Sequence, residues 1–205
     1  SENRLLPRIT GATDLTSIFV ALRCRIPSLG VLCHKSACRD LRCSGRSLQW
    51  RHPDFVRAEM DGVNVDDFLD DLSGLRFPHA FNPYSEKCAV HDVDEAPAIR
   101  RKNLEAILLA ATTNGIDSVW IGRDLGYRGG RRTGLPLTDE AHLSSHAAIF
   151  GCASLCRATK GPMVAERTAT IIWRMLENIG RPVFLWNVFP LHPYEQGDPL
   201  SNRCH

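Results

Sequence analysis

The sequence lacks the long apolar segment that a membrane-spanning helix requires. No apolar run approaches about 18 residues, and the short run at residues 17–22 lies deep in the chain without a small-residue cleavage site, so no signal peptide is expected. A secreted disulfide framework is then not expected either, and the eight cysteines are predicted to be free thiols. These absences favour a cytoplasmic protein that does not bind membranes.

The cysteines also lack the paired C-x2-4-C spacing of most zinc sites. The spacing of Cys152 and Cys156 is not that of an iron–sulfur protein. We therefore expect no metal and no cofactor. A zinc-dependent module near the N-terminus stays open as an alternative, and its ligands would be Cys33, His34, Cys38 and Cys43.

A large net charge is absent too, since the formal value is +2, but the charges are unevenly distributed. Residues 1–53 hold nine Lys/Arg and three Asp/Glu, residues 54–99 hold three and eleven, and residues 100–205 hold thirteen and nine. The basic C-terminal part is the one suited to a polyanion. We predict a basic, cysteine-rich N-terminal segment at 1–53, without a sustained helical or strand period, and an α/β domain at 54–205.

Periodicity in the second part predicts alternating helices and strands. The helices are expected at 63–72, at 97–114, after Asp139 and at 163–180, and an extended loop is expected at 77–84. Apolar runs at 116–121 and 183–186 predict two buried strands. The order helix–strand–loop–helix–strand is typical of a parallel sheet, in which the loops after both strands share one edge.

The loop after the first strand, residues 122–132, contains four glycines and four arginines. Glycine lets backbone amides approach a phosphate, and arginine adds bidentate donors, although the loop is neither a Walker loop nor a dinucleotide motif. A solvated basic turn is the alternative. Asp124, among the arginines, should stay ionised. After the second strand, Asn187 can face the edge of a base, and His192 can supply an acid or a hydrogen-bond donor, unless it is merely structural.

These loops resemble motifs of the uracil-DNA glycosylase superfamily, in particular its bacterial uracil-DNA glycosylase-like branch. The resemblance covers residues 77–205, and its matching segments are 81–84 (F-N-P-Y), 101–104 (R-K-N-L), 122–140, 186–193 (W-N-V-F-P-L-H-P) and 199–203 (P-L-S-N-R). It implies a three-layer α/β/α fold with a short central parallel sheet. It also implies hydrolysis of the N-glycosidic bond of deoxyuridine in single- or double-stranded DNA, by a monomer that flips the base out of the stack.

The resemblance also implies roles for individual residues. Asp124 would orient the attacking water and stabilise the sugar cation, and Asn187 would read the uracil edge. The other implied substrate contacts are Gly122, Arg123, Gly126, Tyr127 and Leu137, and the implied DNA contacts are Arg128, Arg131 and Arg132.

The sequence departs from the family pattern at three places. Leu125-Gly126 stands where relatives show Pro-Tyr or Pro-Gly, so no tyrosine at position 126 can exclude thymine, and Tyr127 or another wall must do so. Leu137 replaces a stacking phenylalanine. The C-terminal strands and their H-P-S-type loop are not found after residue 203, so His192 is the candidate to replace the missing histidine. A non-catalytic nucleic-acid-binding fragment of the same fold is therefore the alternative.

Overall fold

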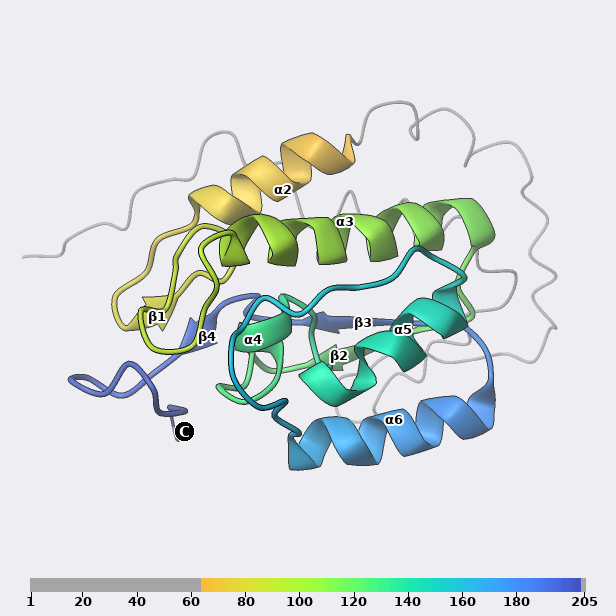
Figure 1. Cartoon of the computed structure of the whole chain (residues 1–205). Coiled ribbons are helices and arrows are strands. Elements are labelled where there is room, and N and C mark those ends of the chain that lie inside the picture. Colours follow the sequence, from red (N-terminus) through yellow and green to blue (C-terminus); the bar gives the residue numbers. More distant parts are fainter. Residues whose placement is uncertain (1–63, 204–205) are drawn as a thin grey trace, which may run out of the picture.

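The computed structural model describes residues 64–203 (Figure 1). The N-terminal segment, with its proposed zinc ligands, lies outside the described residues. The helices are α2 (Val65–Gly74), α3 (Ala96–Asn114), the one-turn α4 (Gly130–Thr133), the 3-10 turn η1 (Glu140–His142), α5 (Leu143–Phe150) and α6 (Arg167–Ile179). The strands are β1 (Ala80–Phe81), β2 (Ser118–Gly122), β3 (Val183–Asn187) and β4 (His192–Pro193).

Strands β2 and β3 form a parallel pair, one of the two small sheets of the described residues. Their register pairs Ser118 with Val183 at one end and Gly122 with Asn187 at the other. Every residue of β3 is buried, whereas β2 is only partly covered and Ile121 is 52% exposed. The predicted parallel strands are confirmed, but the expectation that the first strand is buried was wrong. An apolar run does not reveal whether its strand has a neighbour on both sides.

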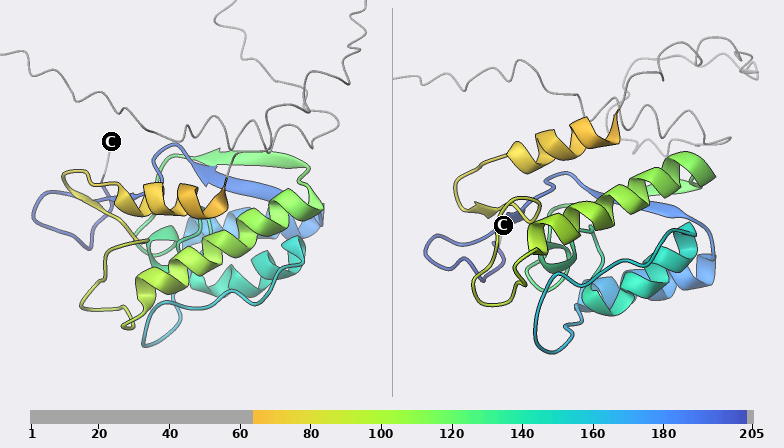
Figure 2. Two further views of the ribbon diagram at one scale, coloured as in Figure 1. Left: turned by 90° about the horizontal axis from the view of Figure 1, so that it is seen from above. Right: turned by 45° about the horizontal axis from the view of Figure 1, so that its top comes forward.

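Helices cover both faces of β3 (Figures 1 and 2). Phe184 and Trp186 join the core formed with α2, α3 and α5, while Val183 and Leu185 pack with α6. Alternate residues of a strand point to opposite faces, so a fully apolar strand such as β3 suits a sheet covered on both sides. The structure thus has the mixed α/β architecture, with parallel strands, that the sequence predicts.

The helix boundaries follow local chemistry. Pro97 lies in the first turn of α3, and Gly115 ends that helix with φ +78°, a left-handed value that favours glycine. Its predicted bounds are confirmed, whereas α6 begins at Arg167, four residues later than predicted. The loops at 77–84 and 187–193 contain the short antiparallel pair β1 and β4, in which Phe81 faces His192.

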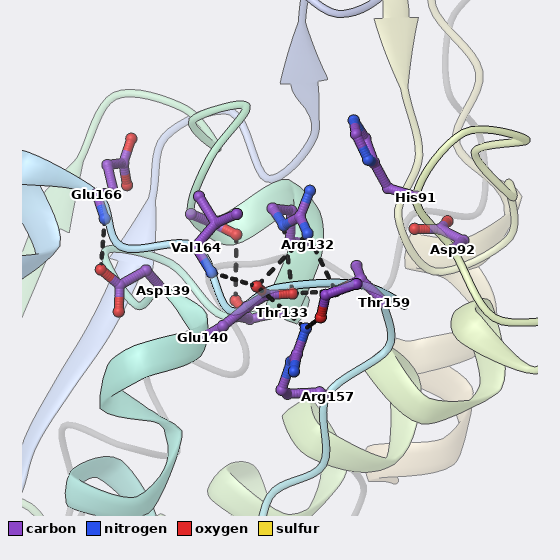
Figure 3. A network of polar contacts seen from close by, with 12 residues as sticks. His91, Asp92, Arg132, Thr133, Asp139, Glu140, Arg157, Thr159, Val164 and Glu166 are labelled. Carbon is purple, nitrogen blue, oxygen red and sulfur yellow. Dashed lines mark hydrogen bonds and ion pairs between the residues drawn. The ribbon is translucent and has the colours of Figure 1, made fainter.

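A network of polar contacts around Glu140 joins three segments of the chain (Figure 3). The Glu140 carboxylate is fully buried, forms an ion pair with Arg132 at 3.2 Å and accepts a hydrogen bond from the Thr159 hydroxyl. It also accepts a 2.8 Å hydrogen bond from the Val164 backbone, and Arg157 lies 3.8 Å away. This carboxylate therefore fixes both α4 and the long connection before α6.

Within the described part of the chain, no helix is both long and apolar enough to cross a membrane.

Substitution Glu140→Gln should destabilise the protein by about 3–5 kcal/mol, because it leaves the Arg132 guanidinium buried without its counter-charge. Chemical denaturation measures the change. The matched control is Asp70→Asn, which removes an ion pair to Arg101 from the exposed face of α2 and should cost no more than about 1 kcal/mol. Equal losses in the two variants would contradict this account of Glu140.

Burial should make His146 a source of acid sensitivity. Its ring packs 4.8 Å from the Trp173 ring, and burial lowers its pKa from 6.5 to about 3. Around pH 5 the unfolded chain binds a proton on this imidazole and the folded protein does not, so stability falls as the pH falls below about 6.5. In His146→Phe, the slope of unfolding free energy against pH should decrease by about 1.4 kcal/mol per pH unit near pH 5. An unchanged slope in denaturation series from pH 7 to 4.5 would contradict this.

Candidate functional site

The loops that follow β2 and β3 run side by side from the carboxyl ends of the strands. The backbone amides of Val188 and Phe189 donate to the carbonyls of Gly122 and Arg123, at 3.0 and 2.9 Å. Further along, the Leu125 amide donates to the Leu191 carbonyl at 3.1 Å. The predicted shared edge is therefore present, and it holds both polar loops against each other.

Asn187 ends β3 with a completely buried side chain. Neither its Oδ1 nor its Nδ2 has a hydrogen-bond partner among residues 64–203. A Cβ on Gly122 would lie 2.4 Å from this Oδ1 and 3.2 Å from the Leu137 side chain. The structure thus brings Gly122, Leu137 and Asn187 together, and it explains why position 122 has no side chain. A buried amide without partners costs stability unless a ligand satisfies it.

Asp124 follows β2 and pairs with its neighbour Arg123. The Arg123 Nε donates to the Asp124 Oδ2 at 2.7 Å, with side-chain exposures of 61% for the arginine and 14% for the aspartate. Both residues line an open cavity of about 470 Å³, whose other lining residues are Phe77, Pro78, His79, Ala80, Phe189, Pro193 and Arg203. The carboxylate therefore has access to solvent and to a ligand of nucleotide size.

The arginines of the loop differ in their burial. Arg128 is exposed, so its predicted contact with DNA stays a prediction. Arg131 is buried with its guanidinium 4.2 Å from the centre of the Phe81 ring and 5.2 Å from that of Tyr127. Arg132 is buried against Glu140. Both guanidiniums lie in the interior of this structure, and their predicted contact with DNA stays a prediction.

His192 is buried on β4, with its ring centre 6.1 Å from that of Tyr127. Burial and the Arg131 guanidinium lower its pKa from 6.5 to about 4, so its ring is neutral near pH 7. The Ser201 backbone and the Asn202 side chain lie nearby, but neither ring nitrogen has a partner of normal hydrogen-bond geometry in the described chain. His192 does not line the cavity at Asp124.

Glu166, which sequence reasoning missed, lies against the same loop. A Cβ on Gly126 would be 2.2 Å from Glu166 Oε1, and one on Gly129 would be 2.1 Å from Oε2. The Glu166 amide donates to the Asp139 carboxylate at 2.6 Å, which holds the residue in place at the start of α6 (Figure 3). Burial, followed by the nearby charge of Asp139, raises the pKa of Glu166.

The absence of side chains at Gly126 and Gly129 is the feature of the sequence that indicates a group packed against this loop, because it leaves room for the Glu166 carboxylate. Tyr127 lies between them, and its hydroxyl is 2.7 Å from His91 Nε2. The Tyr127 backbone amide donates a hydrogen bond to Asn202 Oδ1 at 2.7 Å.

Among residues 64–203, no group of three or more His, Cys, Asp or Glu side chains could hold a metal ion. Cys88, Cys152 and Cys156 are free thiols. Comparison with protein-family models, with curated proteins and with solved structures finds no match to the chain.

Substitution Gly126→Ala should destabilise the protein by no more than about 1 kcal/mol, because the new methyl group takes the place of the Glu166 carboxylate and the flexible end of that side chain can move aside. Removing that carboxylate in Gly126→Ala/Glu166→Ala should recover the loss, so the two changes are non-additive. The control is Gly74→Ala, where nothing lies within 4 Å of the new methyl group. Additive effects in thermal unfolding would show that the two groups do not compete for the same space.

Proposed function

We propose that this protein is a uracil-DNA glycosylase that hydrolyses the N-glycosidic bond of deoxyuridine. The observation that carries the proposal is the buried Asn187 amide, which has neither a donor nor an acceptor partner within the described residues. A polar group of this kind, at the carboxyl end of a parallel strand, suits the reading of a flipped base.

The amide of Asn187 matches the edge of uracil. Its Oδ1 can accept from the uracil N3–H, while its Nδ2 can donate to O4. Cytosine presents an acceptor and a donor at these positions, so each contact would be mispaired at a cost of about 1–3 kcal/mol. The contact of Leu137 with the site supports an apolar surface beside the base, without the stacking that an aromatic ring would supply.

Asp124 is the residue proposed to act on the sugar. As the bond from C1′ to uracil N1 breaks, its electron pair leaves with the base and positive charge develops on the sugar. The ionised carboxylate stabilises that charge and orients a water whose oxygen forms the new bond to C1′, while the proton that this water loses is taken up by the uracil anion. The His192 imidazole is uncharged near pH 7 and keeps one N–H, so its proposed role is that of a neutral hydrogen-bond donor rather than a general acid.

The finer fold assignment belongs to the same proposal. The pairing of Gly122 with Asn187, and the helices on both faces of β3, support a three-layer arrangement of the glycosylase kind. The protein would then bind uracil-containing DNA as a monomer.

The proposal predicts that the protein releases uracil from an oligonucleotide carrying a single deoxyuridine. Single-stranded and duplex substrates are incubated with the protein and then cleaved with alkali at the abasic site. Asp124→Asn should abolish the product, since the neutral amide cannot stabilise the sugar cation. Asp117→Asn, at the opposite end of β2, is the control and should retain activity. Absence of product from the unmodified protein would refute the proposal.

Base selection supplies a second prediction. Asn187→Asp should relax the preference for uracil over cytosine. A protonated carboxyl group has an O–H donor and an acceptor oxygen, so it can donate to cytosine N3 and accept from the cytosine amino group. The measurement compares excision from matched oligonucleotides that carry uracil or cytosine at one position. An unchanged preference in a variant that still excises uracil would show that Asn187 does not read the base.

A further inference from the structure

The cavity beside Asp124 has features that the recognition of one flipped base does not require. Its volume of about 470 Å³ is lined by residues 77–80, by Arg123 and Asp124, and by Phe189, Pro193 and Arg203. Asn187, which is proposed to read the base, is not among its lining residues. Ligand sites typically measure about 300–1,000 Å³, so the cavity has room for a further nucleotide.

An aromatic pair forms one wall of the cavity. The rings of Phe77 and Phe189 meet nearly edge-on, with centres 5.4 Å apart and planes at 69°. Phe77 is 47% exposed. The edge-on contact leaves ring surface available, and an unpaired base can stack on an exposed aromatic ring whatever its sequence.

Two guanidiniums lie at the same cavity. The Arg203 backbone amide donates to Pro193 at 3.3 Å, and the preceding Asn202 holds the Tyr127 amide, so the tail is anchored on both sides. The Arg203 side chain is exposed and has no ion pair within residues 64–203. Arg203 is thus held beside β4 by its own backbone amide and by Asn202. Neither contact uses the guanidinium, which stays available to a ligand.

Arg123 contributes the second cation. Only its Nε is engaged, on Asp124, while the described chain offers no hydrogen bond to its terminal nitrogens. Arginine has five N–H donors in a planar fork, so it can keep Asp124 and bind a phosphate together. The two guanidiniums outnumber the one carboxylate of the cavity, which gives the cavity a positive charge.

We propose that this cavity binds a nucleotide of single-stranded DNA next to the flipped one, with its phosphate on Arg203 and Arg123 and its base stacked on Phe77. The statement that this nucleotide adjoins a flipped base rests on the proposed function, whereas the binding of a strand does not. A duplex keeps its bases stacked and paired, so it cannot offer one to Phe77 without the cost of opening. The protein therefore prefers single strands.

Fluorescence anisotropy with a labelled, uracil-free single strand, and with the same sequence as a duplex, tests this directly. The single strand should bind more tightly. Phe77→Ala should weaken its binding by about tenfold, which corresponds to the loss of one stacked base. Arg203→Gln should lower the slope of log affinity against log salt by about 0.7, the value for one phosphate contact to a single strand.

Matched controls come from the exposed face of α6, which does not line the cavity. Met175→Ala removes an apolar side chain that is 49% exposed, and Arg174→Gln removes an exposed arginine. Both should bind the strand as the unmodified protein does, and thermal unfolding checks that all four variants fold. Equal affinity for duplex and single strand, or no greater loss in Phe77→Ala than in Met175→Ala, would overturn the proposal.

These outcomes separate the two proposals. Because the probe carries no uracil, binding that depends on Phe77 and Arg203 supports the cavity even if no uracil is ever released. Release of uracil by a protein whose strand binding ignores both residues supports the glycosylase and refutes the cavity.

Discussion

The burial of the Glu140 carboxylate is the constraint on which the site depends. A carboxylate removed from water needs charged and hydrogen-bonding partners, and it obtains them from Arg132, Thr159 and the Val164 backbone. These partners belong to segments on both sides of α5. The contacts of these partners with Glu140 fix α4, which follows the Asp124 loop, and they also fix the segment that leads to Glu166. The loop at the sheet edge is therefore fixed at its end in α4 by a network that takes no part in the proposed chemistry.

The proposed site also depends on the absence of side chains at particular positions. Gly122 leaves room for the Asn187 amide, and Gly126 and Gly129 leave room for Glu166. The Glu166 carboxylate thus occupies the space that a side chain at position 126 would fill. The carboxylate of Glu166, the residue that precedes α6, lies beside the loop there, and burial raises its pKa. The wall at position 126 is supplied by another segment of the chain.

Sequence patterns predicted the elements with strong local signals. The bounds of α3 follow from Pro97 and Gly115, and β3 follows from an uninterrupted apolar run. The placement of Gly122 and Asn187 at one edge followed from the parallel order of strands. The exposure of Ile121 and the later start of α6 did not follow, because each depends on neighbours that the local sequence does not specify.

The sequence by itself determined the longer helices and the two parallel strands, but not the short elements α4, β1 and β4. It also placed two polar loops at one edge of the sheet. Local periodicity and capping are sufficient for that. Only the tertiary structure decided which arginines lie at the cavity and which are buried. Four arginines within one loop look equivalent in the sequence, yet Phe81 and Glu140 draw Arg131 and Arg132 inward while Arg123 stays at the cavity. The difference arises because burial of a charge depends on partners that the folded chain brings from elsewhere.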